Sequence, residues 1–301
     1  MRPEQPIPVE GYDQRQEHLH SRCLHIGRLI AILVLASLLS YGFFVEPHRL
    51  RTVTVTIRDR DMADVLGGLR IIQMSDLHLG SNSTITPKEI FAILQKIRPD
   101  LILLTGDLVD WSRSDKDYDE VFDFLSHLHA PLGVFAVMGD ADYSSTRRSC
   151  EYCHRKESGL PVEDHDVRFL RNKLWPLKGR NGRPFMLAGV GWKADNARKK
   201  KLLQSIPPKI PAIMLAHSSV IFRKIPASRN ILVLSGDTHG GQIRLPSFLW
   251  KILALKPDPE HMYGLYHEGR KILYVSSGVG TSEIPFRLGM PPEIVLFQFI
   301  P

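Results

Sequence analysis

The sequence predicts an α/β fold in one large domain that follows a single apolar segment. Short apolar runs of strand length alternate along the chain with stretches of helical periodicity. Residues 29–45 contain no charged side chain. Five of the short apolar runs end in a tight turn that carries an aspartate or a histidine. Layered α/β proteins place ligand sites in such turns, at the carboxyl ends of their strands.

The chain has 301 residues, a net charge of +7 and a hydrophobic fraction of 43%. Residues 51–301 are long enough to form a single core. Much of the excess of basic residues lies in residues 147–201. These residues form either a solvated surface or a positive rim that attracts a phosphorylated substrate or anionic lipid. We assign residues 199–201 to the solvated surface. No nucleic-acid partner is expected, because no binding module is visible and aromatic residues are not interleaved with the basic ones.

Three cysteines, Cys23, Cys150 and Cys153, are too few for a disulfide framework. Cys150, Cys153 and His154 match the C-x-x-C-H pattern of covalent haem attachment, but no haem fold surrounds them. A local metal or redox pair is a second interpretation. We favour the third, in which both are incidental loop cysteines.

Residues 29–45 read LIAILVLASLLSYGFFV and predict a transmembrane anchor, preceded by a tail over residues 1–28. A helix of this length spans about 26 Å at about 1.5 Å per residue, the short end of the spanning range. A cleaved signal peptide is the alternative. We favour the uncleaved anchor because the apolar run is long and lies late, with no small-residue cleavage site after it. Arginines on both sides give only a slight lean towards a cytoplasmic catalytic domain.

The order of the elements follows from periodicity and turn chemistry. Residues 51–57 alternate around β-branched side chains, which predicts a strand. Thr86 and Pro87 open a helix, and apolar residues at helical spacing continue it until Pro99. A second helix is expected over residues 118–128. The remaining apolar runs predict strands over residues 69–75, 101–104, 133–138, 185–190, 212–216, 231–234, 272–275 and 293–299.

Acidic and imidazole side chains directly follow five of these strands. Taken singly, each has a structural explanation, since Asp76 could cap a turn and Asp107 could form an Asx turn. Taken together, carboxylates and imidazoles supply ligands suited to manganese, iron or zinc. We therefore predict a metal site made of Asp76, His78, Asp107, Asp140, His217, Asp237 and His239.

The same residues lie in five ordered motifs, D-x-H, G-D-x-x-D, G-N-H-D/E, a lone histidine and G-H-x-H. In this chain they read Asp76-Leu77-His78, Gly106-Asp107-Leu108-Val109-Asp110, Gly139-Asp140-Ala141-Asp142, His217 and Gly236-Asp237-Thr238-His239. From about residue 69 to residue 300 the sequence resembles the calcineurin-like metallophosphoesterases. Gly240-Gly241-Gln242, Gly278-Val279-Gly280 and the segment from Arg287 to Glu293 resemble the membrane-associated bacterial branch of that family.

The resemblance implies a four-layer α/β/β/α sandwich that binds two divalent metal ions at the strand ends. One ion would be held by Asp76, His78 and His239, and the other by Asp140, His217 and Asp237. Asp107 would bridge them, because its two oxygens can bind separate ions. Such a pair clamps a phosphoryl group and lowers the pKa of a bridging water. The catalytic set would be Asp76, His78, Asp107, His217 and His239, with Asp110 and Asp142 orienting a ligand or its loop.

Three positions depart from the family pattern. Asp140 replaces an asparagine and Asp237 replaces a histidine, so the site gains up to two negative charges. We expect a preference for harder ions, with manganese first and magnesium, iron or zinc as alternatives. Ala141 replaces a histidine that contacts the phosphate and assists the leaving group. The site then suits a leaving group that needs little protonation, or else belongs to a weakened relative with a regulatory role.

The favoured function is hydrolysis of a phosphate ester or pyrophosphate bond on a lipid-linked substrate at the bacterial inner membrane. UDP-2,3-diacylglucosamine, of the lipid A pathway, is the specific candidate that the resemblance implies. The alternatives are an extracytoplasmic cell-envelope phosphodiesterase and a regulatory protein that binds metal or phosphate. Residues 143–171 are either a cap over the substrate or a surface excursion. Residues 245–255 are apolar enough to contact a bilayer or an acyl chain, or to pack on the core.

Overall fold

Two six-stranded sheets form the centre of the protein in the computed structural model, which describes residues 10–111, 115–143, 165–244 and 261–301. The first sheet has the order β1-β12-β2-β3-β4-β5, and the second has the order β10-β11-β9-β8-β7-β6. The strands are β1 (Arg51–Arg58), β2 (Ile71–Met74), β3 (Leu101–Leu104), β4 (Val134–Ala136), β5 (Val167–Phe169), β6 (Lys173–Lys178), β7 (Pro184–Gly189), β8 (Ala212–Leu215), β9 (Ile231–Ser235), β10 (Gly264–Glu268), β11 (Lys271–Val275) and β12 (Glu293–Ile300).

Each sheet contains a set of neighbouring strands that run in parallel, whereas the inner strand β12 of the first sheet runs antiparallel to β2. β2, β3 and β4 pair in parallel in the first sheet, and β7, β8, β9 and β11 do so in the second. Every residue of β2, β3, β8 and β9 is buried, which agrees with their short, continuous apolar sequences. Because the strands of each set run in one direction, their carboxyl ends meet at one edge.

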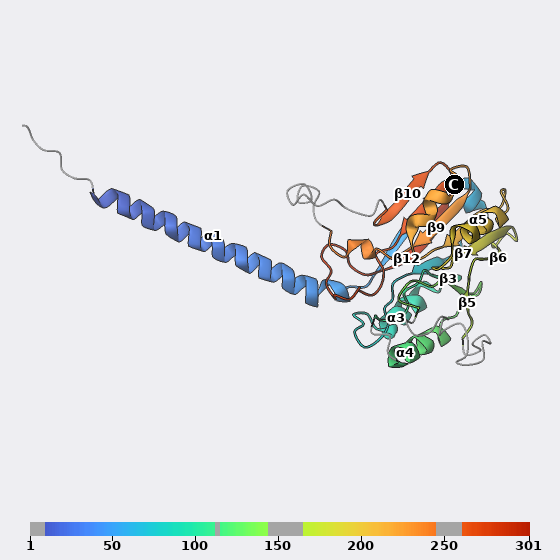
Figure 1. Ribbon diagram of the computed structural model, residues 1–301, viewed down its shortest axis with the longest axis horizontal. Helices are drawn as coiled ribbons and strands as arrows, with labels where there is room; N and C mark the ends of the chain where they lie inside the picture. The colour runs from blue at the N-terminus through green and yellow to red at the C-terminus, as the bar shows by residue number, and fades with distance from the viewer. Residues whose placement is uncertain (1–9, 112–114, 144–164, 245–260) are drawn as a thin grey trace, which may run out of the picture.

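Three apolar clusters separate four layers, as the resemblance implied. The central cluster joins the inner faces of the two sheets through residues such as Leu103 and Phe135 on one side and Leu215 and Leu232 on the other. A second cluster packs α3 (Pro87–Ile97) and α4 (Asp115–Ser126) on the outer face of the first sheet. The third packs α5 (Asn196–Ser205) and the 3-10 helix η2 (Ser219–Lys224) on the second sheet. Figure 1 shows this layered domain.

All nine strands predicted from the sequence are present, with small shifts at their ends. The helix predicted at Pro87 is confirmed, and Thr86 caps it in a reciprocal capping box with Glu89. The second helix spans Asp115–Ser126 rather than residues 118–128. The sequence did not predict α2 (Arg60–Leu66), α5, β5, β6 or β10. β6 and β10 lie at the edge of the second sheet, where exposure removes the apolar pattern that marks a buried strand.

The helix α1 (Glu10–Phe44) extends as a rod away from the layered domain (Figure 1). It begins well before the predicted anchor at residues 29–45, because helical hydrogen bonding continues through a polar stretch that hydropathy excludes. The helical stretch His20–His48, which runs from α1 into the 3-10 helix η1 (Glu46–His48), is long and apolar enough to cross a membrane. Leu29, Ile32 and Leu35 are exposed along it.

The base of α1 packs on a loop near the C-terminus. The backbone amide of Arg287 donates to the carbonyl of Gly42 over 3.0 Å, and the ring centroids of Phe43 and Phe286 lie 4.8 Å apart. Just after the helix, the buried carboxylate of Glu46 accepts a 2.8 Å hydrogen bond from the amide of Gly289. The direction in which α1 leaves the domain is therefore fixed by specific contacts.

Candidate metal centre

The seven predicted ligands converge where the carboxyl ends of the two parallel sets meet. Three loops of the first sheet, after β2, β3 and β4, face two loops of the second sheet, after β8 and β9. The structure brings together three overlapping groups of ligand atoms, each within 4.8 Å of one another. These groups are Asp76, His78 and His239; Asp76, Asp107 and His217; and Asp140, His217 and Asp237.

The first group places two imidazoles face to face. Nε2 of His78 lies 3.2 Å from Nε2 of His239, and Nε2 of His239 lies 3.8 Å from Oδ1 of Asp76. The Nδ1 atom of His78 lies 3.3 Å from the carbonyl of Val109 and donates to it, so its Nε2 keeps a lone pair. Two imidazole nitrogens that point at each other beside a carboxylate form a natural cation site.

The second ligand group, made of Asp140, His217 and Asp237, centres on His217. Its Nε2 atom lies 3.4 Å from Oδ1 of Asp140, 3.8 Å from Oδ1 of Asp237 and 3.4 Å from Oδ2 of Asp107. Its Nδ1 atom donates to the carbonyl of Thr105 over 2.9 Å, which again directs a lone pair into the site. The same Oδ2 of Asp107 lies 3.8 Å from Nε2 of His78, so Asp107 stands between the two groups.

Five of the seven residues adopt a left-handed backbone conformation, which non-glycine residues rarely occupy. Their φ angles are 50° for Asp76, 42° for His78, 53° for Asp107, 76° for Asp237 and 50° for His239. Such conformations cost roughly 1–3 kcal/mol each and cluster at functional sites. The surrounding fold therefore holds these side chains in the site against a local backbone preference.

The donor set fits a bound cation. Within the described residues, Oδ2 of Asp76, Nε2 of His217 and Nδ1 of His239 are buried and have no hydrogen-bond partner. Buried polar atoms without partners are rare in folded proteins and call for an ion or water. Carboxylate oxygens and imidazole nitrogens together suit manganese, iron or zinc. The residues present thus fit the divalent ions that the sequence predicts.

The electrostatics show what the cluster does without a cation. Burial raises the pKa of Asp76 to about 7. Burial by itself raises the pKa of Asp107, but the positive charge of His217, together with its hydrogen bond, outweighs burial and lowers the pKa of Asp107 to about 2. Burial by itself lowers the pKa of His217, yet Asp107 and then Asp140 raise it well above its usual value. A proton on His217 therefore stands in for a cation among these carboxylates.

The histidines of the first group behave in the opposite way. Burial lowers the pKa of His78, and it lowers the pKa of His239 well below its usual value, with help from the charges of His78 and Arg287. Both imidazoles are therefore neutral at neutral pH. Neutral imidazole is the form that binds metal ions.

Asp142 lies behind the ligands and connects two of their loops. Its carboxylate accepts hydrogen bonds from the backbone amides of Asp107, Leu108 and Gly139, at 2.9, 2.7 and 2.9 Å. Burial raises its pKa to about 7. Asp110 is also buried and lies 3.5 Å from the amide nitrogen of Asn82. The geometry of Asp142 serves to hold the loops after β3 and β4 together.

Ala141 contributes only its backbone to the site. Its amide donates to Oδ1 of Asp107 over 2.9 Å, and its methyl group is buried. A methyl group can neither contact phosphate through a hydrogen bond nor protonate a leaving group.

Two tryptophans and an arginine beside the ligands were not predicted. The ring of Trp111 stacks on His78 at 5.6 Å, and the ring of Trp192 meets His217 edge-on at 5.3 Å. Arg287 is fully buried, and its guanidinium donates to the carbonyls of Ser277, Gly280 and Met290. Trp111 directly follows the second motif, which is a weak sequence signal; Trp192 carries none.

Arg287 connects the base of α1 with the first ligand group. It holds the loop of Gly278 and Gly280, and the amide of Gly280 donates to the carbonyl of Asp76 over 2.7 Å. A side chain at Gly278 would collide with Asp76. Burial lowers the pKa of Arg287 to about 10, so it stays charged at neutral pH. The motif formed by Gly278, Gly280 and Arg287, which resembles the membrane-associated branch, therefore contacts the site directly through this loop.

Some predicted features lie outside the described residues. They are the cysteines Cys150 and Cys153 with His154, the basic residues from Arg147 to Lys156, residues 144–164 of the expected cap, and the apolar residues 245–255. Among the described basic residues, Arg180 and Arg183 pair with Asp100 and Asp64 on the surface. Asp100 directly precedes β3, so Arg180 lies at the end of that strand opposite to the one that Asp107 follows.

Comparison with known proteins identifies the family. Residues 69–241, more than half of the chain, match the calcineurin-like phosphoesterase family, and the chain belongs to it. It is 28% identical over 85% of its length to the uncharacterized metallophosphoesterase YkuE of Bacillus subtilis, of which the match covers 88%. It is also 28% identical to the UDP-2,3-diacylglucosamine pyrophosphatase LpxG of Chlamydia trachomatis, over 84% of this chain and 90% of that protein. The fold and family together define a metal-dependent phosphoesterase.

Metal binding is expected to stabilise the full chain more strongly as pH rises. The pKa of Asp76 is about 7 in the folded chain against an ordinary 3.8, so its contribution to stability is lost as pH rises from about 4 through about 7. The raised pKa of His217 acts in the same direction above about 6.5. A divalent cation displaces these protons and restores the loss.

The measurement is the melting temperature with Mn²⁺ and with EDTA between pH 5 and pH 8. We expect the gain from Mn²⁺ to be larger at pH 8 than at pH 5 by about 5 °C or more. In an Asp76→Asn variant the dependence on pH should weaken. A gain of the same size at every pH would contradict this account.

Arg287→Met should weaken both the fold and the metal site. It leaves three buried carbonyls without their donor, at a cost of roughly 3 kcal/mol or more in the free energy of unfolding. Mn²⁺ affinity should fall about 10-fold, since the loop that supports Asp76 is released. The control is Arg58→Met at an exposed position. Loss of stability with unchanged Mn²⁺ affinity, measured by calorimetry, would show that this loop does not position the ligands.

Proposed function

We propose that the protein is a membrane-anchored enzyme that hydrolyses a phosphate ester or pyrophosphate bond with two divalent metal ions. The observation that carries the proposal is the convergence of seven carboxylate and imidazole side chains into overlapping groups that share Asp76 and His217, with Asp107 between His78 and His217. Two bound ions would polarise a phosphoryl group and supply hydroxide from water at neutral pH. We favour manganese, because four carboxylates make this an oxygen-rich site.

The residues have distinct tasks in this proposal. Asp76, His78 and His239 would hold one ion, and Asp140, His217 and Asp237 would hold the other. Asp107 would contribute to both. The backbone carbonyls of Val109 and Thr105 fix His78 and His217 with their Nε2 atoms towards the ions. Asp142 keeps the loops of Asp107 and Asp140 in register through their backbone amides.

Because Ala141 offers no acidic side chain, we infer that the leaving group departs without being protonated by the protein. An alkoxide leaves poorly without a proton, whereas a phosphate monoester leaves as an anion whose conjugate acid has a pKa of about 6. A pyrophosphate bond therefore suits this site better than an alkyl phosphate ester. The likeness to LpxG makes UDP-2,3-diacylglucosamine our specific substrate candidate.

The helix α1 supports the proposal of a membrane-associated substrate. Exposed leucines and isoleucines line α1, and Arg287 holds its base on the loop beside Asp76. A substrate with acyl chains in the same bilayer would reach the site without leaving the lipid. We place the catalytic domain in the cytoplasm of a bacterial cell, in keeping with the slight excess of arginine after the span and with a nucleotide substrate.

Turnover is tested with purified full-length protein in detergent and Mn²⁺. The substrates are bis(p-nitrophenyl) phosphate and UDP-2,3-diacylglucosamine in mixed micelles. We expect hydrolysis of the pyrophosphate. In Asp107→Asn its rate should fall at least about 100-fold, because the carboxylate that lies between the two ligand groups is removed. Asp119→Asn, at an exposed position, is the control and should keep full activity. Absence of turnover on both substrates by metal-loaded wild-type protein would refute the proposal.

The role of Ala141 is tested with aryl phosphodiesters whose phenols have pKa values from about 7 to about 10. The rate of the wild-type enzyme should fall steeply as the phenol becomes less acidic, since no side chain protonates it. Ala141→His should flatten this dependence while hydrolysis of the pyrophosphate stays within about 3-fold. Metal content is measured in parallel. Equal slopes in the two proteins with equal metal content would mean that position 141 does not govern the leaving group.

A further inference from the structure

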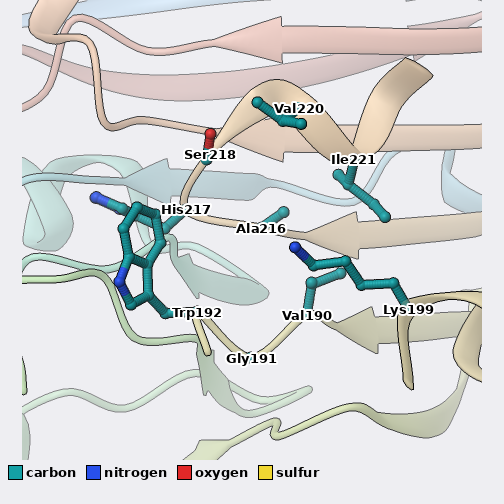
Figure 2. Close-up of a pocket in the computed structure, with 9 residues that line it drawn as sticks. All are labelled: Val190, Gly191, Trp192, Lys199, Ala216, His217, Ser218, Val220 and Ile221. Atoms are coloured by element: carbon teal, nitrogen blue, oxygen red, sulfur yellow. The ribbon is translucent and has the colours of Figure 1, made fainter. Parts of the chain in front are cut away.

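A pocket of about 230 Å³ opens beside His217 (Figure 2). Its walls come from the loop after β7, the loop after β8, the 3-10 helix η2 and the helix α5. Val190 and Ala216 give it an apolar floor, Trp192 forms one side, and Lys199 extends across it from α5. The sequence did not predict this pocket, because its residues are apolar, aromatic or single members of a basic run.

The pocket is continuous with the second ligand group. His217 belongs to both, and its ring lies 5.3 Å from the ring of Trp192. Ser218 lines the pocket, and its hydroxyl hydrogen-bonds to the carboxylate of the ligand Asp237. A molecule held at His217 and Asp237 would therefore extend directly into this space.

Lys199 is the cation of the pocket. It is half-buried, whereas the next residue, Lys200, is exposed. Within the described residues the amine of Lys199 has no hydrogen bond or ion pair, while its neighbour Arg198 pairs with Asp195. This position corrects the expectation that residues 199–201 all belong to a solvated surface. A half-buried ammonium group that faces a pocket is available to an anionic ligand.

The net charge of the metal centre indicates why a cation is needed beside it. Asp76, Asp107, Asp140 and Asp237 would together neutralise two divalent ions. In the family pattern two of these positions are uncharged, and the site keeps a net positive charge for the phosphate. Here the attraction for an anionic substrate has to come from a neighbouring cation, and among the residues lining the pocket Lys199 alone carries a permanent positive charge.

We propose that this pocket binds the departing half of a pyrophosphate substrate, with Lys199 on its phosphate and Trp192 against the group that the phosphate carries. The inference rests on the proposed function and extends it to the leaving-group subsite. In the reaction the water oxygen bonds to the attacked phosphorus, and the bond from that phosphorus to the bridging oxygen breaks. The bridging oxygen takes the electron pair as part of a phosphomonoester, and the proton of the water passes to solvent.

Lys199 therefore stabilises the charge that develops on the departing phosphate, where Ala141 offers no proton. A hydrocarbon chain is not expected in this pocket. It would displace water from the ammonium group of Lys199 without offering a hydrogen bond in return, which is unfavourable. The shared chemistry of the ligand is a phosphomonoester. Its source is either the nucleotide or the sugar phosphate, and inhibition by the two products distinguishes them.

The test compares Lys199→Ala with Lys200→Ala, its exposed neighbour, in the full-length Mn²⁺-loaded protein. Loss of a charged hydrogen bond to the departing phosphate should lower kcat/KM for UDP-2,3-diacylglucosamine about 10- to 100-fold. Hydrolysis of bis(p-nitrophenyl) phosphate, whose leaving group carries no phosphate, should change less than about 3-fold. Lys199→Arg should restore most of the activity, and Lys200→Ala should match the wild type.

Product inhibition assigns the occupant. The inhibition constant of UMP or of glucosamine 1-phosphate should rise in Lys199→Ala for the product that enters the pocket, and stay unchanged for the other. An equal loss on both substrates, or no loss beyond that of Lys200→Ala, would overturn the inference.

Failure of the proposed function is distinguishable from failure of this inference. If the wild-type protein hydrolyses neither substrate, calorimetric binding of UMP and of inorganic phosphate to the Mn²⁺-loaded protein still tests the pocket. Weaker binding of either in Lys199→Ala than in Lys200→Ala would support the subsite. Equal binding in both variants would refute it.

Discussion

The packing of the two sheets through their inner faces is the interaction on which the rest of this structure depends. It aligns the carboxyl ends of β2, β3 and β4 with those of β8 and β9. Hydrogen bonds between the sheets fix the alignment beside the site. The buried amide of Gln73 donates to the carbonyl of Ser235, and the backbone amide of Asp237 donates to the carboxylate of Asp76. A relative shift of the sheets would break these bonds and separate the ligands.

That alignment concentrates charge in a buried place. Asp76 and Asp107 lie among neutral and protonated imidazoles, and their pKa values are driven apart, to about 7 and about 2. Five of the predicted ligands also hold a left-handed backbone. A cation that replaced the protons would compensate both costs, and folding would then be coupled to metal binding.

The chain also connects the site with its proposed anchor. Contacts run from Gly42 and Glu46 at the base of α1, through Arg287, to the loop of Gly280 that supports Asp76. Because α1 leaves the domain in a fixed direction, a membrane around it would set the height of the site above the lipid surface. A lipid-linked pyrophosphate and a pocket beside His217 that carries the cation Lys199 are consistent with that arrangement.

The sequence by itself determined which side chains gather at the site, the buried strands and the apolar helix. Asp76, Asp107 and His217 were predictable because a short apolar run followed by a polar turn is a local pattern, and its repetition in motif order leaves little choice. The tertiary structure alone decided the roles of Asp142, Arg287 and Trp192, since their contacts join segments far apart in the chain. It also decided that Lys199 faces the pocket and Lys200 the solvent. In the polar helix α5 Leu202 is the one fully buried residue, so no apolar stripe in the sequence distinguishes its faces.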